Sequence, residues 1–344
     1  MYKKRQIFFI AILVLLAVVC LYPFFKHEQK PIIFKSSLTY NYFPIILNER
    51  IPILGVQIDG AIYGNTTSYL VPNRVYQSPA RWTEIEAERG VYVFTDWLDK
   101  NVAYFGDNYI IIGTKTTPIW ARVWEKQGSP PKEEYYLSYA KFLVAICERY
   151  DIWGIEVYNE PDVEKDLVDD ATQYWFGAWV EGTDYYGAGV RYGQMMSVVY
   201  PFVKDKCNVK LISGALIGEE TSLEFLRGML DGGLQTDYIS YHKYIYNRDQ
   251  FSKIYEFEKK IKNITSIPII VTETSVLSNL GGDEHQQIKA DYIDYLKETL
   301  SGSDISLVEI YSWNNGWRNS ELLPNNIPSL SYYEWAKDTY DLQK

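Results

Sequence analysis

The strongest constraint on the fold is a regular alternation of short apolar runs with helix-like segments. Eight runs rich in β-branched residues recur, at residues 51–58, 74–77, 109–114, 153–158, 209–213, 238–241, 267–272 and 307–313. Amphipathic segments lie between most of them, at residues 96–105, 133–150, 189–204, 222–230, 252–261 and 283–300, and a last one follows at 331–340. Such alternation is typical of a parallel sheet with right-handed crossovers.

The number of units favours a closed barrel. Eight strand–helix units over about 290 residues fit an α/β fold of the (β/α)8 TIM-barrel type, which typically takes about 250 residues, better than an open doubly wound sheet. The first unit is irregular, because residues 59–72 resemble a loop rather than a helix. No repeat, low-complexity block or linker divides residues 51–344, so we expect a single barrel domain there.

The N-terminus predicts a membrane anchor. Residues 1–6 are basic, and residues 7–25 are almost uninterruptedly apolar, which as a helix spans roughly 28 Å. A cleaved signal peptide has a shorter apolar core and a small-residue exit site, and neither is visible. We therefore expect residues 1–25 to be an uncleaved transmembrane helix and residues 26–50 a stalk. The basic end should be cytoplasmic and the barrel extracytoplasmic.

Charge and cysteine content exclude several function classes. The formal net charge is −10, whereas nucleic-acid binding needs a basic footprint for the phosphates. Three cysteines make neither a disulfide framework nor a metal cluster, and the pairing of Cys147 with Cys207 stays open. The sequence has no CxxC, HExxH or phosphate-binding glycine loop. We expect no nucleic-acid partner, no metal and no cofactor.

Titratable and aromatic residues follow several of the apolar runs. In a parallel barrel the C-terminal ends of all strands meet at one rim, where catalytic residues lie. The fourth run leads into Asn159 and Glu160, and the seventh leads into Glu273. The other rim candidates are Trp120 after the third run, His242 and Tyr244 after the sixth, and Trp313 at the end of the eighth. Each alone is compatible with a structural role, but their joint placement at one rim favours a site.

Two carboxylates on one rim suit the cleavage of a glycosidic bond. One carboxyl group donates a proton to the leaving oxygen and the other attacks the anomeric carbon, through an oxocarbenium-like transition state. Retention of configuration requires the two groups to lie about 5–5.5 Å apart. The aromatic content of 16% suits either a large core or rings that stack on sugars.

These motifs resemble those of clan A glycoside hydrolases, the retaining (β/α)8 enzymes. Asn159-Glu160-Pro161 and Glu273 match the two signatures of the clan. Residues 81–94 are similar to its pattern W-x-x-I-E-x-x-x-G-x-Y-x-F, and Thr117-Pro118-Ile119-Trp120 also fits. Within the clan, the set looks nearest to family 39, with the cellulase-like family 5 and family 42 as neighbours.

The resemblance implies a role for each matching residue. Glu160 corresponds to the general acid/base and Glu273 to the nucleophile, and Asn159 corresponds to the residue that hydrogen-bonds the sugar 2-hydroxyl. Tyr244 corresponds to the phenol that orients the nucleophile, with His242 nearby.

Three more substrate-binding residues follow from the same resemblance. Trp313 corresponds to the platform under the sugar in the −1 subsite, and Trp120 belongs to the motif after the third run. For the strand-two arginine of the clan, Arg74 fits a strand position and Arg81 precedes the motif tryptophan; we favour Arg74.

We therefore expect a membrane-anchored, retaining β-glycoside hydrolase that acts on a polysaccharide or oligosaccharide. One alternative is a catalytically silent barrel that binds glycan in a polysaccharide export complex. Another is a retaining transglycosylase, which shares every catalytic residue. Residues 162–186, with Tyr174 and Trp175 among their aromatic side chains, are either a hydrophobic loop packed on the barrel or a subsite wall.

Overall fold

The computed structural model describes residues 53–58, 68–71, 74–106, 108–278, 282–314 and 320–337. The expected membrane segment at residues 1–25 and the expected stalk at residues 26–50 lie outside these ranges. Across the described residues, no helix combines the length and the apolar character that crossing a bilayer requires.

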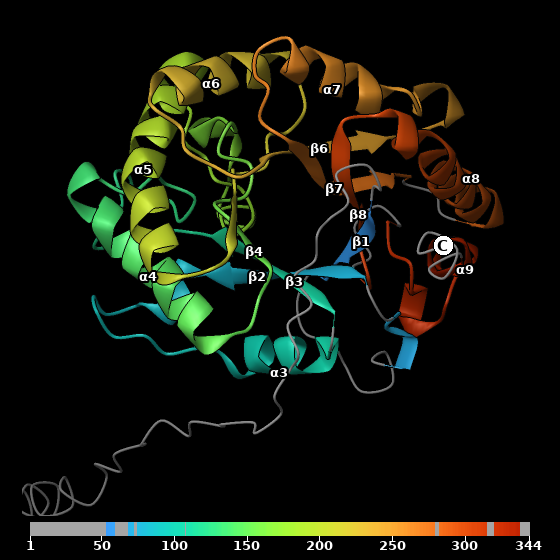
Figure 1. Cartoon of the computed structure of the whole chain (residues 1–344), viewed down its shortest axis with the longest axis horizontal. Helices are drawn as coiled ribbons and strands as arrows, with labels where there is room; N and C mark the ends of the chain where they lie inside the picture. Colours follow the sequence, from blue (N-terminus) through green and yellow to red (C-terminus); the bar gives the residue numbers. More distant parts are fainter. Residues whose placement is uncertain are drawn as a thin grey trace, which may run out of the picture. The chain divides into compact units, whose positions relative to one another are not determined.

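Eight parallel strands of the described residues curl into a nearly closed barrel (Figure 1). Their order in the sheet is β5-β4-β3-β2-β1-β8-β7-β6, and isolated parallel bridges such as Ile212–Tyr238 join the regions of β5 and β6. The strands are β1 (Ile53–Gln57), β2 (Val75–Arg81), β3 (Tyr109–Lys115), β4 (Gly154–Glu156), β5 (Lys210–Ile212), β6 (Ile239–Ile245), β7 (Ile269–Val276) and β8 (Ile305–Tyr311). The predicted parallel barrel is confirmed.

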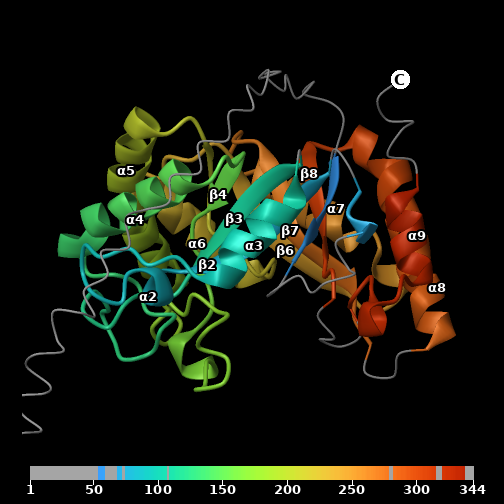
Figure 2. The same cartoon turned by 90° about the horizontal axis from the view of Figure 1, so that it is seen from below.

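Helices cover the outer face of the barrel, and the loops after β2, β3 and β4 gather on the same side as α2 (Figures 1 and 2). The α-helices are α2 (Trp82–Ile85), α3 (Asp96–Phe105), α4 (Tyr136–Arg149), α5 (Tyr185–Lys206), α6 (Glu220–Asp231), α7 (Lys253–Lys262), α8 (Asp283–Thr299) and α9 (Leu330–Ala336). Short 3-10 turns are η3 (Glu133–Tyr135), η4 (Lys165–Leu167), η5 (Arg248–Gln250), η6 (Leu300–Gly302) and η8 (Pro324–Asn326).

Helix α5 begins four residues before the predicted start at Gly189. The Asp184 side chain accepts a hydrogen bond from the Gly187 amide at 2.8 Å and so caps the first turn. Glycine at position 189 is required by the packing on α6, because a Cβ atom there would lie 2.1 Å from the carbonyl oxygen of Phe225. The glycines that weaken the helical pattern in the sequence therefore let α5 and α6 approach each other closely.

The barrel interior is apolar at one end and polar at the other. Val75, Ile111, Ile212, Ile270 and Leu307 form a buried apolar layer. Because strand side chains alternate with a period of two, residues two positions further along face the same way. Those residues are polar on several strands, namely Gln77, Thr272 and Glu309, and all three are buried. The apolar layer thus lies below a polar one, which faces the C-terminal rim.

Cys147 in α4 and Cys207 at the end of α5 form a disulfide, with their Cα atoms 6.3 Å apart. The bond joins two neighbouring helices on the outside of the barrel. It resolves the pairing that the sequence left open.

Candidate active site

The segment after β4 presents Glu160 on an unusual backbone. The φ angles of Tyr158 and Glu160 are +69° and +47°, in a region that costs a residue with a side chain roughly 1–2 kcal/mol. The Tyr158 amide donates to Thr114 Oγ1 at 3.0 Å, and the Tyr158 hydroxyl shares a 2.7 Å hydrogen bond with Thr117 Oγ1. The neighbouring β3 segment therefore holds the turn that brings Glu160 to the rim. Backbone strain of this kind concentrates at functional sites.

Strand β7 carries Glu273 within the strand rather than after its end. In the pairing with β6, Tyr241 lies opposite Val271 and His242 lies opposite Glu273, so Thr272 is an extra residue on β7. An insertion of this kind is a β-bulge, which re-aims the side chains beside it. The strand then continues to Val276, four residues beyond the predicted end.

His242 joins the two glutamates. Its Nδ1 atom lies 2.7 Å from Glu160 Oε1 and 3.5 Å from Glu273 Oε2. A carboxylate oxygen of Glu160 and one of Glu273 lie within 4.8 Å of each other. The Tyr244 hydroxyl donates a hydrogen bond to Glu273 Oε2. The structure thus brings together four of the predicted site residues, two from β6, one from β7 and one from the turn after β4.

The charges of this group shift its protonation equilibria. Burial alone favours the neutral imidazole of His242, but the carboxylates of Glu273, Glu160 and Glu156 outweigh it and raise the pKa to about 9. Burial raises the pKa of Glu273, and so does the charge of Glu160, whereas the cations of His242 and Lys115 lower it. His242 is therefore cationic at neutral pH and supports the ionised form of Glu273.

Two further carboxyl groups lie in the polar layer below the rim, and the sequence analysis missed both. Glu156 accepts hydrogen bonds from Gln77 Nε2 at 3.1 Å and Ser240 Oγ at 3.0 Å, and burial raises its pKa. Glu309 is fully buried, and burial raises its pKa well above the usual range. Among the described residues, neither its carboxyl oxygens nor the side-chain amide of Gln57 has a hydrogen-bond partner. The signal for both glutamates was their place in the inward-facing phase of β4 and β8.

Asn159 lies beside Glu160, as the motif predicts. Its Nδ2 atom donates to the Trp175 carbonyl at 2.8 Å, and its Oδ1 atom is buried without a partner among the described residues. Asp162, which the sequence analysis missed, is fully buried behind this turn and accepts a 2.6 Å hydrogen bond from Ser222 Oγ. Burial raises the pKa of Asp162 to about 7.

Arg74 does not reach the rim, so its predicted role in substrate binding is wrong. It precedes β2 at the opposite end of the strand, where its guanidinium donates to the carbonyls of Leu54 at 3.2 Å and Trp335 at 2.8 Å. The run at residues 74–77 is only the start of a strand that continues through Pro79 to Arg81. Arg81 is the arginine at the rim end of this strand.

Trp313 is not a sugar platform, because its side chain is fully buried. Its ring packs edge-on against Tyr76 and Trp335, with centroid distances of 6.3 and 5.8 Å. Strand β8 ends at Tyr311, two residues earlier, and the Tyr311 ring meets the Tyr244 ring edge-on at 5.8 Å. Tyr311 is therefore the aromatic residue of β8 that lies beside Tyr244, the hydrogen-bond partner of Glu273.

Trp120 is half-buried in the loop after β3 and packs among other loop residues. Its ring meets the rings of Trp82 at 5.5 Å and Tyr135 at 5.3 Å, and its Nε1 atom donates to the Glu86 carbonyl at 3.3 Å. These contacts do not connect it to the glutamate pair. Substrate binding by Trp120 stays a prediction.

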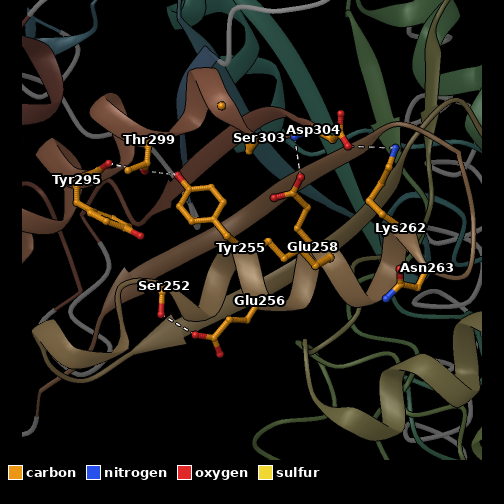
Figure 3. Close-up of a pocket in the computed structure, with 12 residues that line it drawn as sticks. Ser252, Tyr255, Glu256, Glu258, Lys262, Asn263, Tyr295, Thr299, Ser303 and Asp304 are labelled. Atoms are coloured by element: carbon orange, nitrogen blue, oxygen red, sulfur yellow. Dashed lines mark hydrogen bonds and ion pairs between the residues drawn. The ribbon is translucent and has the colours of Figure 1, made fainter.

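A pocket of about 650 Å³, separate from the rim, lies beside α7 and the segment that leads into β8 (Figure 3). Its buried carboxylate, Glu258, accepts a 2.6 Å hydrogen bond from the Asp304 amide, and Lys262 lies 3.7 Å from the Asp304 carboxylate. These groups satisfy one another, and the pocket lies at the N-terminal ends of β7 and β8. It does not contain the paired carboxylates of the rim.

The same Glu160, His242 and Glu273 atoms lie close enough to surround a metal ion. Three ligands of this kind with an open fourth position would suit Zn²⁺. A metal ion bound there would require His242 to lose a proton, and it would compete with the hydrogen bond between His242 Nδ1 and Glu160.

Several solved structures of glycoside hydrolases share the fold of this chain. No family model and no curated protein matches the chain. A family 39 glycoside hydrolase from the gut symbiont Bacteroides cellulosilyticus WH2 superposes with a TM-score of 0.59 at 18% identity, over 85% of this chain and 64% of that chain. This chain therefore spans less than two thirds of that protein.

Two other solved structures extend the comparison. A family 39 β-xylosidase from Caulobacter crescentus gives a TM-score of 0.58 at 16% identity, over 84% of this chain and 71% of that one. A family 128 endo-β-1,3-glucanase variant from Amycolatopsis mediterranei, in complex with laminarihexaose, gives 0.51 at 12%, over 83% and 98%. At these identities the likeness shows the fold, and at that level it confirms the resemblance that the motifs indicate.

Proposed function

We propose that this chain is a retaining β-glycoside hydrolase acting on an oligosaccharide or polysaccharide. The observation that carries the proposal is the pair Glu160 and Glu273, which reach one rim from β4 and β7 with oxygens within 4.8 Å of each other. Retaining enzymes hold their carboxyl groups about 5–5.5 Å apart, whereas inverting enzymes leave about 6.5–9.5 Å for a water molecule. The short separation favours the retaining mechanism.

In the first step, Glu273 attacks the anomeric carbon and the bond from that carbon to the leaving oxygen breaks. Glu160 gives a proton to the leaving oxygen, so a neutral alcohol departs and a glycosyl ester of Glu273 remains. The 2.7 Å hydrogen bond from His242 Nδ1 to Glu160 Oε1 fixes the orientation of the Glu160 carboxyl group. Tyr244 and His242 hold the Glu273 carboxylate for the attack.

In the second step, Glu160 takes a proton from water and the resulting oxygen attacks the same carbon. The ester bond breaks and Glu273 is released as a carboxylate, with the anomeric configuration retained. Glu273 carries no charge while it is esterified, so the environment of Glu160 changes between the two steps. This change suits a residue that acts first as an acid and then as a base.

Two alternatives keep the same fold. A transglycosylase would use the same residues but would pass the glycosyl group to a sugar instead of water, and added acceptor sugar would then change the products. A silent glycan-binding barrel would bind oligosaccharide and release no reducing ends. The close carboxylate pair and its partners His242 and Tyr244 favour an enzyme over the silent barrel.

The site of action is a separate part of the proposal. We propose that residues 1–25 anchor the chain in a membrane and leave the barrel outside the cytoplasm, on the grounds of their basic start and apolar run. Membrane fractionation with protease treatment of intact cells tests it. Recovery of the full-length chain from the aqueous fraction would contradict the anchor.

The direct test of activity uses aryl β-glycosides and two variants, Glu273→Gln and Glu160→Ala. Both should lose most turnover, and azide should restore part of the activity of Glu160→Ala by replacing water in the second step. Glu224→Gln, an exposed position on α6, is the matched control and should behave as wild type. If both site variants keep wild-type turnover, the proposed function is wrong.

A further inference from the structure

Two cations stand side by side at the rim. Arg81 is the last residue of β2, Lys115 is the last residue of β3, and the two are register partners in the sheet. Both approach the same indole ring: Arg81 Cζ lies 5.1 Å and Lys115 Nζ lies 5.2 Å from the centroid of Trp175. The two positive charges therefore converge on one aromatic side chain from neighbouring strands.

Donor groups of both Lys115 and Arg81 lack hydrogen-bond acceptors among the described residues. Lys115 is only 5% exposed, and among the described residues its ammonium group takes part in no hydrogen bond or ion pair. Arg81 Nη1 lies 2.8 Å from Glu84 Oε1, but the Arg81 Nε atom is buried without a partner among the described residues. The buried Arg81 Nε atom lacks an acceptor, which is costly, and the Lys115 ammonium group beside it has no acceptor from the described residues, so an acceptor from outside the chain could serve this cation pair.

The cation pair borders the catalytic carboxylates. The Trp175 backbone carbonyl accepts the hydrogen bond from Asn159 Nδ2 at 2.8 Å, next to Glu160 in the chain. The positive charge of Lys115 lowers the pKa of Glu273. No ion pair joins Lys115 to Glu273 within 4.0 Å, so the ammonium group remains available to a third partner.

We propose that Arg81 and Lys115 bind an anionic substituent of the glycan, a carboxylate or a sulfate, so that the substrate is an acidic sugar chain. This inference rests on the proposed function. Arginine presents a planar fork that matches a carboxylate or sulfate, and lysine adds a second point charge. The Trp175 ring next to both cations offers an apolar surface to the sugar that carries the anion.

The test measures binding of glucuronate, glucose 6-sulfate and glucose to the full chain by titration calorimetry. Wild-type protein should bind at least one anionic sugar about 10- to 100-fold more tightly than glucose, the effect expected of charge-assisted hydrogen bonds. The tighter of the two anionic sugars identifies the substituent. Lys115→Gln and Arg81→Gln should each remove most of this preference.

Controls separate charge from folding. Lys115→Arg keeps the charge and should keep most of the preference, and Lys100→Gln, exposed on α3, makes the same change in net charge and should leave it intact. Equal binding of all three sugars by wild-type protein would overturn the proposal, and so would a preference that survives both Lys115→Gln and Arg81→Gln.

Failure of this inference and failure of the proposed function give different results. If the protein cleaves aryl glycosides in a way that depends on Glu273 but binds the three sugars equally, only the acidic-substrate inference is wrong. If the protein prefers anionic sugars strongly but cleaves no glycoside, the anion-binding site is supported and the proposed hydrolase activity is wrong.

Discussion

Replacing His242 by asparagine separates the charge of this residue from its hydrogen bond. The Nδ2 atom of an asparagine can take the place of His242 Nδ1 as donor to Glu160, but it carries no positive charge. Wild-type His242, with a pKa raised to about 9, is cationic over the whole acidic range. His242→Asn therefore removes a cation that lies 3.5 Å from Glu273 Oε2.

The magnitude follows from that distance. With an effective dielectric constant of about 20, two unit charges 3.5 Å apart interact by about 5 kcal/mol, an upper limit because water and neighbouring dipoles respond to the lost charge. One pKa unit corresponds to about 1.4 kcal/mol. Loss of a nearby opposite charge typically moves a carboxyl pKa by about 1–3 units. Burial already raises the pKa of Glu273, and the variant should raise it further.

The assay is the pH dependence of kcat/KM on a 2,4-dinitrophenyl β-glycoside. That leaving group departs without a proton, so the acidic limb reports the ionisation of Glu273 alone. In His242→Asn this limb should move upward by about one to three pH units. His285→Asn, a buried histidine on α8, is the control and should leave the limb in place. A limb within about 0.3 pH units of wild type in a folded His242→Asn protein would refute the reasoning.

Three other changes probe the surroundings. Tyr244→Phe removes the hydroxyl that donates to Glu273 and should lower kcat/KM about 10- to 100-fold; unchanged kinetics would show that this hydroxyl does not hold the nucleophile. Trp313→Ala should lower the free energy of unfolding in urea by about 3–5 kcal/mol, because the side chain is buried in the core. Tyr311→Ala should raise KM about 10-fold, because the ring lies at the rim. A raised KM for Trp313→Ala and lost stability for Tyr311→Ala would contradict these two positions. Asp162 has a pKa of about 7 when folded, so its stabilising contribution is complete below about pH 4 and is lost as the pH rises through 7. Asp162→Asn should therefore flatten the decline in the free energy of unfolding from pH 4 to pH 8, by up to about 4 kcal/mol. Parallel pH curves for the variant and wild type would exclude this role.

The barrel could be predicted because its signal is repeated. Each apolar run and each amphipathic segment is short, but eight alternations leave few topologies that bury all of them. The pairing of the two glutamates could be predicted for a related reason. Glu160 and Glu273 each lie within two residues of the end of an apolar run, and strand order alone brings the ends of parallel strands to one rim.

The errors arose where strand ends were misjudged. The predicted run at residues 74–77 covered only the first part of β2, which continues through Pro79 to Arg81, so Arg74 fitted a strand position but lies at the end away from the rim. In β8 the inward-facing phase includes Glu309 and Tyr311, so Trp313 lies beyond the strand and turns back into the core. In both cases an error of a few residues moved a side chain from one end or face of the sheet to another.

Protonation states are harder to predict from the sequence than the positions of side chains are. Glu309 and Glu273 are both glutamates on inward-facing strand positions, yet they differ in their neighbours. Glu309 has no hydrogen-bond partner among the described residues, and burial raises its pKa well above the usual range, which favours its neutral form. Glu273 lies next to the cations of His242 and Lys115, which oppose the effect of burial on its pKa. Glu273 is thus the carboxyl group whose ionised form receives support from neighbouring cations, whereas burial and the charges of Glu156 and Glu273 favour the neutral form of Glu309.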